Sequence, residues 1–326
     1  MLTPTSNFMK PTACILITLT LLAMPYAAHA DHGPGTSGGG AFTQSAETMK
    51  PGTLSADVRF DYTSFDSLSA NDIKSKVARA GGIDLLDSAS LTTLSLGYGV
   101  AENFQLSLSL GYYSASGASD VEAEDGELET ATFNPDGFTD MVLSGKYRFY
   151  RGPLGQFAFI GGLKIPTGRD EVTNSAGERV EPSATAGSGS WDYVTGLAYS
   201  TFLTSRLTRD ASALYTFRTE HDDFRLGNRV DAGVALAYRF NDDVKAFPQT
   251  SAFVEANLRH LSMSEEGGED DVNTGGTTFF VSPGFRVRFS PAVAFSLAVQ
   301  VPLAQDLNGE QLETEYKLSA ALSITF

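Results

Sequence analysis

The sequence is poor in cysteine, in histidine and in positive charge. Cys14 is the only cysteine among 326 residues, which excludes a fold held together by disulfides. The formal net charge is −16, and phosphate binding requires a basic surface, so nucleic acid is excluded as a partner. With four histidines and one cysteine, the chain offers few residues for a catalytic or metal site. We therefore expect no catalytic residues, no metal and no cofactor.

Long hydrophobic runs are also lacking, except near the start of the chain. Residues 1–30 resemble a secretory signal peptide, in which Lys10 provides the positive charge and residues 14–24 the apolar run. That run is too short to cross a bilayer as a helix, which takes about 20 residues. The triplet Ala28-His29-Ala30 has the small residues of a cleavage site. We predict that residues 1–30 are removed during export.

Residues 31–52 are rich in glycine and show no periodicity, which is typical of a flexible segment. We expect a disordered periplasmic tail here. The alternative is a plug that folds back into the protein.

From Thr53 onward, apolar and polar side chains alternate, which is the pattern of β-strands. The last segment shows it most clearly, because Leu318, Leu322 and Phe326 share one face while Lys317 and Ser319 share the other. Twelve such segments are predicted: 53–63, 90–100, 104–114, 137–150, 155–166, 189–202, 208–218, 228–240, 249–262, 276–289, 293–302 and 312–326.

The connections between these segments alternate between short and long. Up-and-down outer-membrane barrels have an even strand count, short periplasmic turns and long extracellular loops. Aromatic residues lie near the ends of the apolar faces, which indicates two interfacial girdles and disfavours the alternative of a secreted β-sandwich or lipocalin-like barrel. We predict an all-β transmembrane barrel of about twelve antiparallel strands over residues 53–326, in the outer membrane of a Gram-negative bacterium.

The chain closes on an aromatic residue, Phe326, as bacterial outer-membrane proteins do at their sorting signal. We expect Phe326 to direct membrane insertion by the barrel assembly machinery. The expected surroundings of the folded protein are outer-membrane lipid and lipopolysaccharide.

The face of the strands opposite the lipid face carries charge of both signs. A barrel of twelve strands lies between the filled eight-stranded barrels and the open barrels of about 16–18 strands, so a narrow or gated pore is expected. Lys146, Lys164 and Asp192 fall on three consecutive segments, as a selectivity element or as structural pairing; Pro166, Thr167 and Gly168 end a strand. The lumen and selectivity candidates are Lys146, Arg148, Lys164, Asp192, Arg218, Asp231, Arg239, Glu255, Arg259, Arg286, Arg288, Glu313, Glu315 and Lys317.

Two predicted extracellular loops, within 115–136 and 263–275, are strongly acidic. We interpret them as solvated surface, with weak divalent-cation bridging to lipopolysaccharide as the alternative. A structural or adhesive barrel that acts through these loops is an alternative function.

A second alternative is enzymatic. His260 and Ser262 form an H-x-S pair on a predicted lipid-exposed face, and this spacing resembles outer-membrane phospholipase A, another twelve-stranded barrel. Met263 and Ser264 follow where that family has Asn-Gly, and a Ser–His pair also needs an orienting group and an oxyanion hole.

Several phrases resemble a bacterial family named for the meta-pathway of phenol degradation and labelled as transporters. They are the start DHGPGTSGGG with QSAETMKPG, GFTDMVLSGKYRFY (137–150), GLKIPTG (162–168) and GSGSWDY (187–193). The block Phe42-Thr43-Gln44 departs from the more apolar, Asn-containing stretch of that family. The resemblance implies an outer-membrane channel or transporter for passive or gated passage of small, including hydrophobic or aromatic, compounds.

Overall fold

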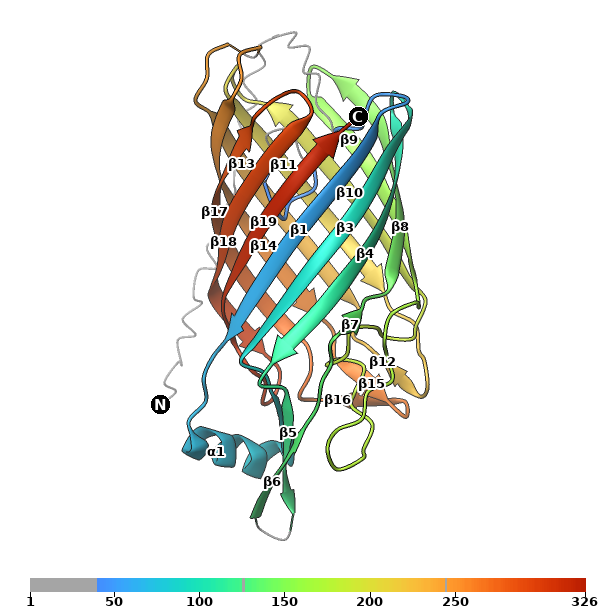
Figure 1. Cartoon of the computed structure of the whole chain (residues 1–326), viewed down its shortest axis with the longest axis vertical. Helices are drawn as coiled ribbons and strands as arrows, with labels where there is room; N and C mark the ends of the chain where they lie inside the picture. The colour runs from blue at the N-terminus through green and yellow to red at the C-terminus, as the bar shows by residue number, and fades with distance from the viewer. Residues whose placement is uncertain (1–39, 125–126, 244) are drawn as a thin grey trace, which may run out of the picture.

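The structure, a computed structural model, describes residues 40–124, 127–243 and 245–326. The predicted signal peptide, 1–30, and residues 31–39 lie outside this described part. Twelve long strands form the body of the molecule (Figure 1). They are β1 (Leu54–Phe65), β3 (Ser88–Ala101), β4 (Phe104–Ser116), β8 (Met141–Gly152), β9 (Gly155–Ile165), β10 (Asp192–Phe202), β11 (Leu207–Phe217), β13 (Arg229–Arg239), β14 (Gln249–Leu261), β17 (Gly276–Arg288), β18 (Val293–Leu307) and β19 (Thr314–Thr325).

The strands close into a barrel because β1 pairs with β3 on one side and with the last strand, β19, on the other. Every pairing between neighbouring strands of the ring is antiparallel. Closure leaves no free sheet edge, as a membrane-spanning sheet requires. The predicted all-β, twelve-stranded up-and-down barrel is confirmed.

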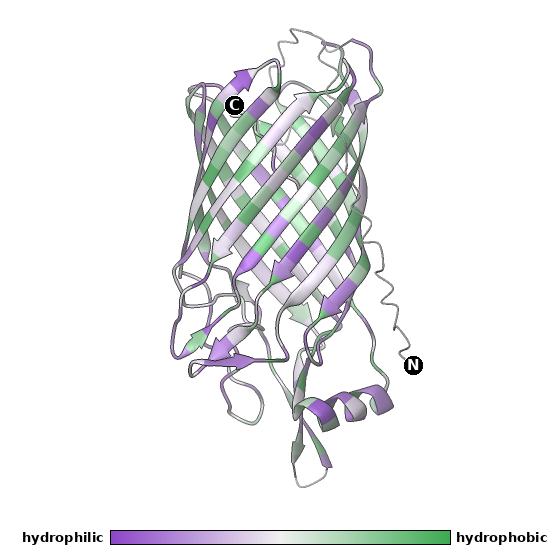
Figure 2. Cartoon of the chain, turned by 180° about the vertical axis from the view of Figure 1, so that it is seen from behind, coloured by the Kyte–Doolittle hydropathy of each residue, from purple (hydrophilic) through white to green (hydrophobic). Residues whose placement is uncertain are grey.

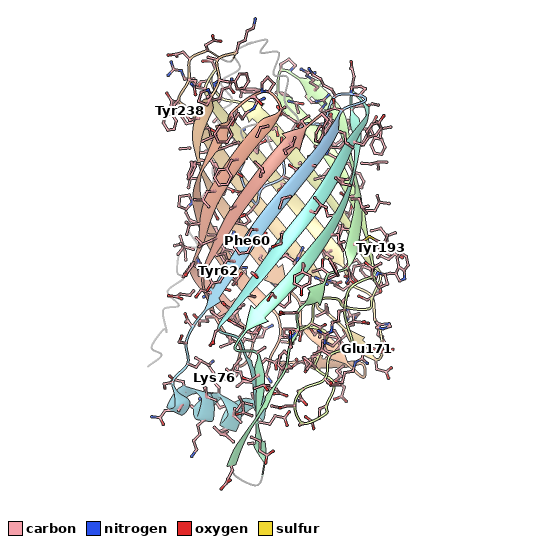
Figure 3. The ribbon with its side chains drawn as sticks, viewed as in Figure 1. Phe60, Tyr62, Lys76, Glu171, Tyr193 and Tyr238 are labelled. Carbon is pink, nitrogen blue, oxygen red and sulfur yellow. The ribbon has the colours of Figure 1, made fainter. Side chains whose placement is uncertain are left out.

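The alternation of side chains places apolar residues outside and polar residues inside. Leu318 and Leu322 of β19 are exposed on the outer surface, whereas Ser319 and Ser323 are buried. Green and purple positions alternate along the strands in Figure 2. Aromatic rings are part of the outer surface, with Tyr238 and Tyr193 near its two ends (Figure 3). The outside therefore has the apolar belt and the aromatic rings of a membrane barrel.

The two ends of the barrel differ. The chain enters β1 and leaves β19 at the end with short turns, the periplasmic end, where Leu54 and Phe326 exchange backbone hydrogen bonds. The long connections at the extracellular end carry elements that the sequence did not predict. These are α1 (Ala70–Ala80), β2 (Gly82–Leu85), β5 (Ser119–Glu124), β6 (Glu127–Thr132), β12 (Phe224–Arg225), β15 (Ser264–Glu266) and β16 (Glu269–Asp271). The predicted strand 137–150 is divided into β7 (Gly137–Phe138) and β8.

Helix α1 has local signals at both ends. Ser69 and Asp72 form a capping box at its start, and Gly81, with φ of 91°, follows its end. Val77 on its inner face packs with Ile83 of β2 and Val121 of β5. Among the described residues, no helix combines the length and the apolar character needed to cross a bilayer.

Candidate channel lumen

A segment that precedes the first strand lies inside the barrel. The Glu255 carboxylate, on β14 and 1% exposed, accepts hydrogen bonds from the backbone N–H groups of Ala41, Phe42 and Thr43. The Thr43 hydroxyl also donates to Glu255, at 2.7 Å. Three consecutive amides around one carboxylate compensate much of the cost of burying its charge.

The same segment then crosses the lumen to the opposite wall. The Ala46 N–H donates to the Ser200 hydroxyl of β10 at 2.8 Å, and Lys146 Nζ of β8 donates to the Ser45 carbonyl at 2.7 Å. The Met49 N–H donates to Gln105 Oε1 of β4 at 3.0 Å. In the ring of twelve strands, β14 and β4 are six positions apart, so the segment spans the interior.

We call residues 40–50 the lumen segment. The prediction of a disordered periplasmic tail is wrong for these residues, and the alternative of a plug describes them. The sequence pattern could not reveal this, because the segment is held mainly through backbone N–H and C=O groups, which carry no residue-specific signal. A glycine makes room for it: a Cβ on Gly99 of β3 would lie 1.9 Å from the Lys50 carbonyl oxygen.

A second group of charges lies at the extracellular end of the lumen, where β9, β10 and β11 meet. Lys164 Nζ lies 2.6 Å from Asp192 and 3.1 Å from Asp140, and Arg218 lies 3.1 Å from Asp192. Asp192 is fully buried. Two cations therefore face two carboxylates in a site that is mostly shielded from water.

The geometry separates Lys146 from this cluster. On the β8–β9 pair, Lys164 faces Val142, whereas Lys146 faces Ile160, four residues nearer the periplasm. Lys146 binds the lumen segment instead. Of the three residues that the sequence groups together, Lys164 and Asp192 therefore form an ion pair, whereas Lys146 contacts the lumen segment.

The strand-end motif supports the Lys164 cluster. Thr167 accepts a hydrogen bond from the Met141 N–H at 3.0 Å, and the Gly168 N–H donates to Asp140 at 2.9 Å. Pro166 directly follows the end of β9. These contacts fix the Asp140 carboxylate beside Lys164, so the motif has a positioning role at the extracellular end of the lumen.

A third charged group continues around the same end. Asp231 of β13 lies 2.8 Å from Arg259 of β14 and 2.6 Å from Arg229. The register places Asp231 opposite Leu214 of β11, in the extracellular half of the barrel. Paired charges therefore line the extracellular half of the lumen, and the lumen segment occupies the periplasmic half.

The remaining predicted residues lie along the lumen or at its rims. Arg286 donates to the Gly40 carbonyl at 3.2 Å, and Arg288 to Gln249. At the periplasmic rim, Arg148 donates to the Glu102 carbonyl and Arg239 to the Ser205 carbonyl. Glu313 and Glu315 are exposed at the extracellular rim rather than inside; Glu315 accepts from the Ser64 hydroxyl.

Sequence reasoning missed two acidic groups of the lumen. Asp210 on β11 is 2% exposed and binds the Ser200 hydroxyl. It has the same strand parity as Arg218, so the alternation could have placed it inside. Glu47 belongs to the lumen segment, where no strand pattern exists to apply.

Three cations of the lumen lie over aromatic rings. Arg59 lies 4.8 Å from the centre of the Phe42 ring, and Arg286 lies 5.7 Å from that of Phe253. Lys317 Nζ lies 5.1 Å from the ring centre of Phe280. Phe253 and Phe280 point inward, with exposures of 5% and 3%. The lumen therefore combines ring faces with cations, a contact known as a cation–π interaction.

The geometry around His260 differs from a Ser–His catalytic pair. His260 Nδ1 lies 2.9 Å from the Thr277 hydroxyl of the neighbouring strand. Ser262 lies beyond the end of β14, and its backbone N–H donates to the Asn228 carbonyl. The partner that orients the imidazole is a hydroxyl and not a carboxylate or an amide. Within the described ranges, no three His, Cys, Asp or Glu residues are grouped so that they could hold a metal ion.

A closed antiparallel barrel with an apolar outer belt and a charged lumen defines an outer-membrane β-barrel of a Gram-negative bacterium, embedded in lipid and lipopolysaccharide. The chain belongs to the family described as "Putative MetA-pathway of phenol degradation", whose model matches residues 59–306. The resemblance to this family in the sequence is thereby confirmed.

Several solved structures are similar to this chain. An outer membrane channel from Pseudomonas putida F1 is 14% identical, with a TM-score of 0.57, over 86% of this chain and 98% of that chain. The NanC porin is 14% identical, with a TM-score of 0.43, over 82% and 98% of the two chains. LpxR from Salmonella typhimurium is 12% identical, with a TM-score of 0.44, over 84% and 100%. No curated protein matches the sequence.

Proposed function

We propose that this protein is a passive channel for small aromatic compounds that carry a polar or anionic group, and that the lumen segment acts as its gate. The observation that carries the proposal is the set of three cation–aromatic pairs in the lumen, at Phe42, Phe253 and Phe280. The family description names phenol degradation, and the related protein from Pseudomonas putida is described as a channel.

The chemistry of these pairs suits such a solute. An aromatic ring can stack on a lumen phenylalanine, and the hydroxyl or carboxylate that it bears can accept a hydrogen bond from the adjacent cation. Arg286 has two buried donor nitrogens, Nε and Nη1, without a hydrogen-bond partner among the described residues. Such donors favour a solute that brings its own acceptor.

The gate follows from the position of the lumen segment. It is anchored by Glu255 on one wall and by Lys146 and Ser200 on the other, so it obstructs the periplasmic half of the lumen. Each of these three anchors is a hydrogen bond to a side chain, with a net contribution of about 1 kcal/mol, or somewhat more where a charged group takes part. A shift of the segment is therefore accessible without unfolding of the barrel, and solutes diffuse down their gradient when it moves.

Solute flux tests the proposed substrate class. The purified protein in liposomes should pass benzoate faster than cyclohexanecarboxylate, which has the same charge but no aromatic ring. Lys317→Met removes the cation beside Phe280, and we expect it to lower the benzoate flux several-fold and to reduce the preference. Lys74→Met on α1, outside the lumen, should behave like the parent.

Equal fluxes of the two acids would contradict the aromatic class while leaving a general channel intact. No flux of either acid would favour the alternative of a structural or adhesive barrel.

A further inference from the structure

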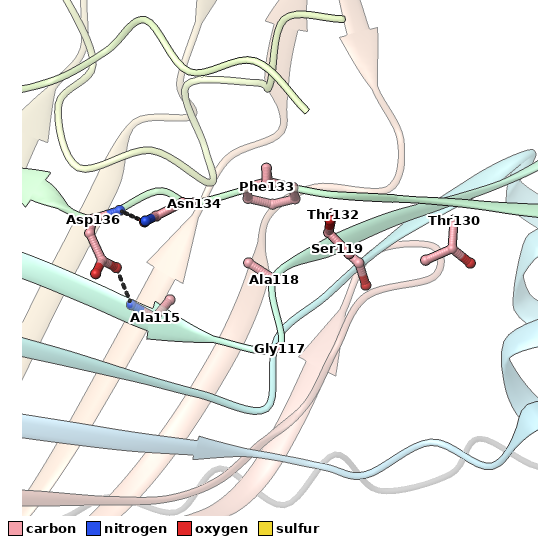
Figure 4. Close-up of a pocket in the computed structure, with 9 residues that line it drawn as sticks. All are labelled: Ala115, Gly117, Ala118, Ser119, Thr130, Thr132, Phe133, Asn134 and Asp136. Atoms are coloured by element: carbon pink, nitrogen blue, oxygen red, sulfur yellow. Dashed lines mark hydrogen bonds between the residues drawn. The ribbon is translucent and has the colours of Figure 1, made fainter. Parts of the chain in front are cut away.

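A pocket lies at the extracellular end, outside the lumen contacts described above. It has a volume of about 470 Å³, within the range of about 300–1,000 Å³ for small-molecule sites. The end of β4 forms one wall and the β5–β6 ribbon the other (Figure 4). Its polar lining consists of Ser119, Thr130, Thr132, Asn134 and Asp136, and Phe133 supplies a ring.

The hydroxyl groups of this lining are not used by the protein. Ser119 and Thr132 are directly opposite each other on β5 and β6, and Thr130 follows on the same face two residues along. Among the described residues, none of these three hydroxyls has a hydrogen-bond partner; Ser119 is 9% exposed, and Thr130 and Thr132 are exposed at the pocket surface. Three hydroxyls therefore converge on one space with their donors and acceptors available.

The amide and the carboxylate are fixed and still have capacity. Asn134 Oδ1 accepts from the Asp136 N–H at 2.9 Å, and Asp136 Oδ1 accepts from the Ala115 N–H at 3.0 Å (Figure 4). These bonds orient both side chains and leave the Asn134 amino group and the second Asp136 oxygen for a ligand. Phe133 is held in place by its packing against Val172 and Val180.

The charge of the surrounding segment restricts the ligand. Residues 115–136 include seven Asp and Glu and no Lys or Arg. Arg169, from the connection after β9, donates to the Asp136 carbonyl at 2.8 Å, but one cation beside seven carboxylates leaves the surroundings negative. A phosphorylated or carboxylated ligand would therefore be repelled. An uncharged ligand with many hydroxyl groups and one apolar face fits this lining. Its hydroxyl groups can form hydrogen bonds with the hydroxyls, the amide and the carboxylate, and its apolar face can pack against the Phe133 ring.

We infer that this pocket is a binding site for a neutral saccharide. The C–H face of a sugar ring lies against Phe133, and its hydroxyls exchange hydrogen bonds with Thr130, Thr132 and Asp136. The residues that line this site take no part in the lumen contacts described above, and the inference does not depend on which solute the channel conducts.

Saturation-transfer NMR on the whole protein in detergent micelles tests the site. The probes are N-acetylglucosamine, glucose and galactose, with glucose 6-phosphate and galacturonate as anionic counterparts. We expect transfer to at least one neutral sugar and to neither anion. The Thr130→Val/Thr132→Val variant keeps the shape and removes two hydroxyls, so it should weaken binding about tenfold or more.

Thr173→Val, on an exposed threonine of another extracellular connection, should bind like the parent. The bilayer conductance of the double variant should also be unchanged, which separates this proposal from the channel proposal. No transfer to any neutral sugar, equal binding by parent and double variant, or equal transfer to the anions would overturn the inference.

Discussion

Individual charged residues stabilise the barrel from within. Lys164 is bonded to two carboxylates, and its removal would leave Asp140 and Asp192 with Arg218 as the one remaining cation of the cluster. A buried carboxylate without its partner is costly, because it has lost its hydration without compensation.

We therefore expect Lys164→Met to lower the free energy of unfolding by about 3 kcal/mol. Urea titration of the folded protein in lipid, followed by tryptophan fluorescence or gel mobility, measures the change. Lys74→Met, which removes a charge from an exposed helix position, should shift it by less than about 0.5 kcal/mol. Equal stability of parent and Lys164→Met would show that the cluster is not a stabilising element.

For individual residues, the sequence predicts which side chains face the interior of the barrel. Strand parity alone places Glu255, Arg286 and Asp192 inside the barrel, and all three are buried there. Parity does not predict which residues meet, because contacts depend on the register between strands. Parity groups Lys146 with Lys164, although the register separates them by four residues.

Among the elements, helix α1 is attached to the barrel mouth by ion pairs. Lys76 and Arg79 both bind Glu310, in the connection between β18 and β19. The hydrogen bonds from Arg79 and Lys76 lower the pKa of Glu310 to about 2 from its usual 4.5. A lowered pKa means that the attachment is fully present above about pH 4.5 and is lost as the pH falls towards 2.

Digestion by pepsin tests this attachment, since the protease is active across that range. At pH 4, Glu310→Gln should expose α1 and accelerate cleavage between residues 66 and 87 relative to the parent. At pH 2.5 the difference should shrink, because the parent has itself begun to lose the charged pair. Glu129→Gln, at an exposed position of β6, serves as the control. Equal cleavage of parent and Glu310→Gln at pH 4 would exclude a role for these pairs.

The hydrophobic pattern predicts some of these elements and not others. The twelve strands are long and periodic, so each predicted segment overlaps one of them. Helix α1 has 11 residues and only two apolar ones on its inner side, Ile73 and Val77, so its pattern does not stand out within a polar connection. The lumen segment has no regular secondary structure and thus no period to detect.

For the whole molecule, average composition is misleading. A mean hydropathy of −0.10 would suit a soluble globular protein, yet it averages one strand face towards lipid, another towards the lumen, and polar connections. The charge is also distributed unevenly. Paired charges of both signs line the lumen, whereas every charged side chain of residues 115–136 is negative. We propose that this barrel conducts and that the lumen segment restricts conduction.

Planar-bilayer recording measures both the conduction and its restriction by the lumen segment. Glu255→Gln weakens the anchor of the lumen segment, and the pair Ser45→Cys/Ser200→Cys can lock it, since these hydroxyls lie 3.0 Å apart and Cys14 belongs to the predicted signal peptide. The account predicts small steps for the parent and larger steps for Glu255→Gln. In the combined triple variant, the steps should be small when the cysteines are oxidised and larger after reduction. Steps of one size in all these proteins, or no steps at all, would contradict it.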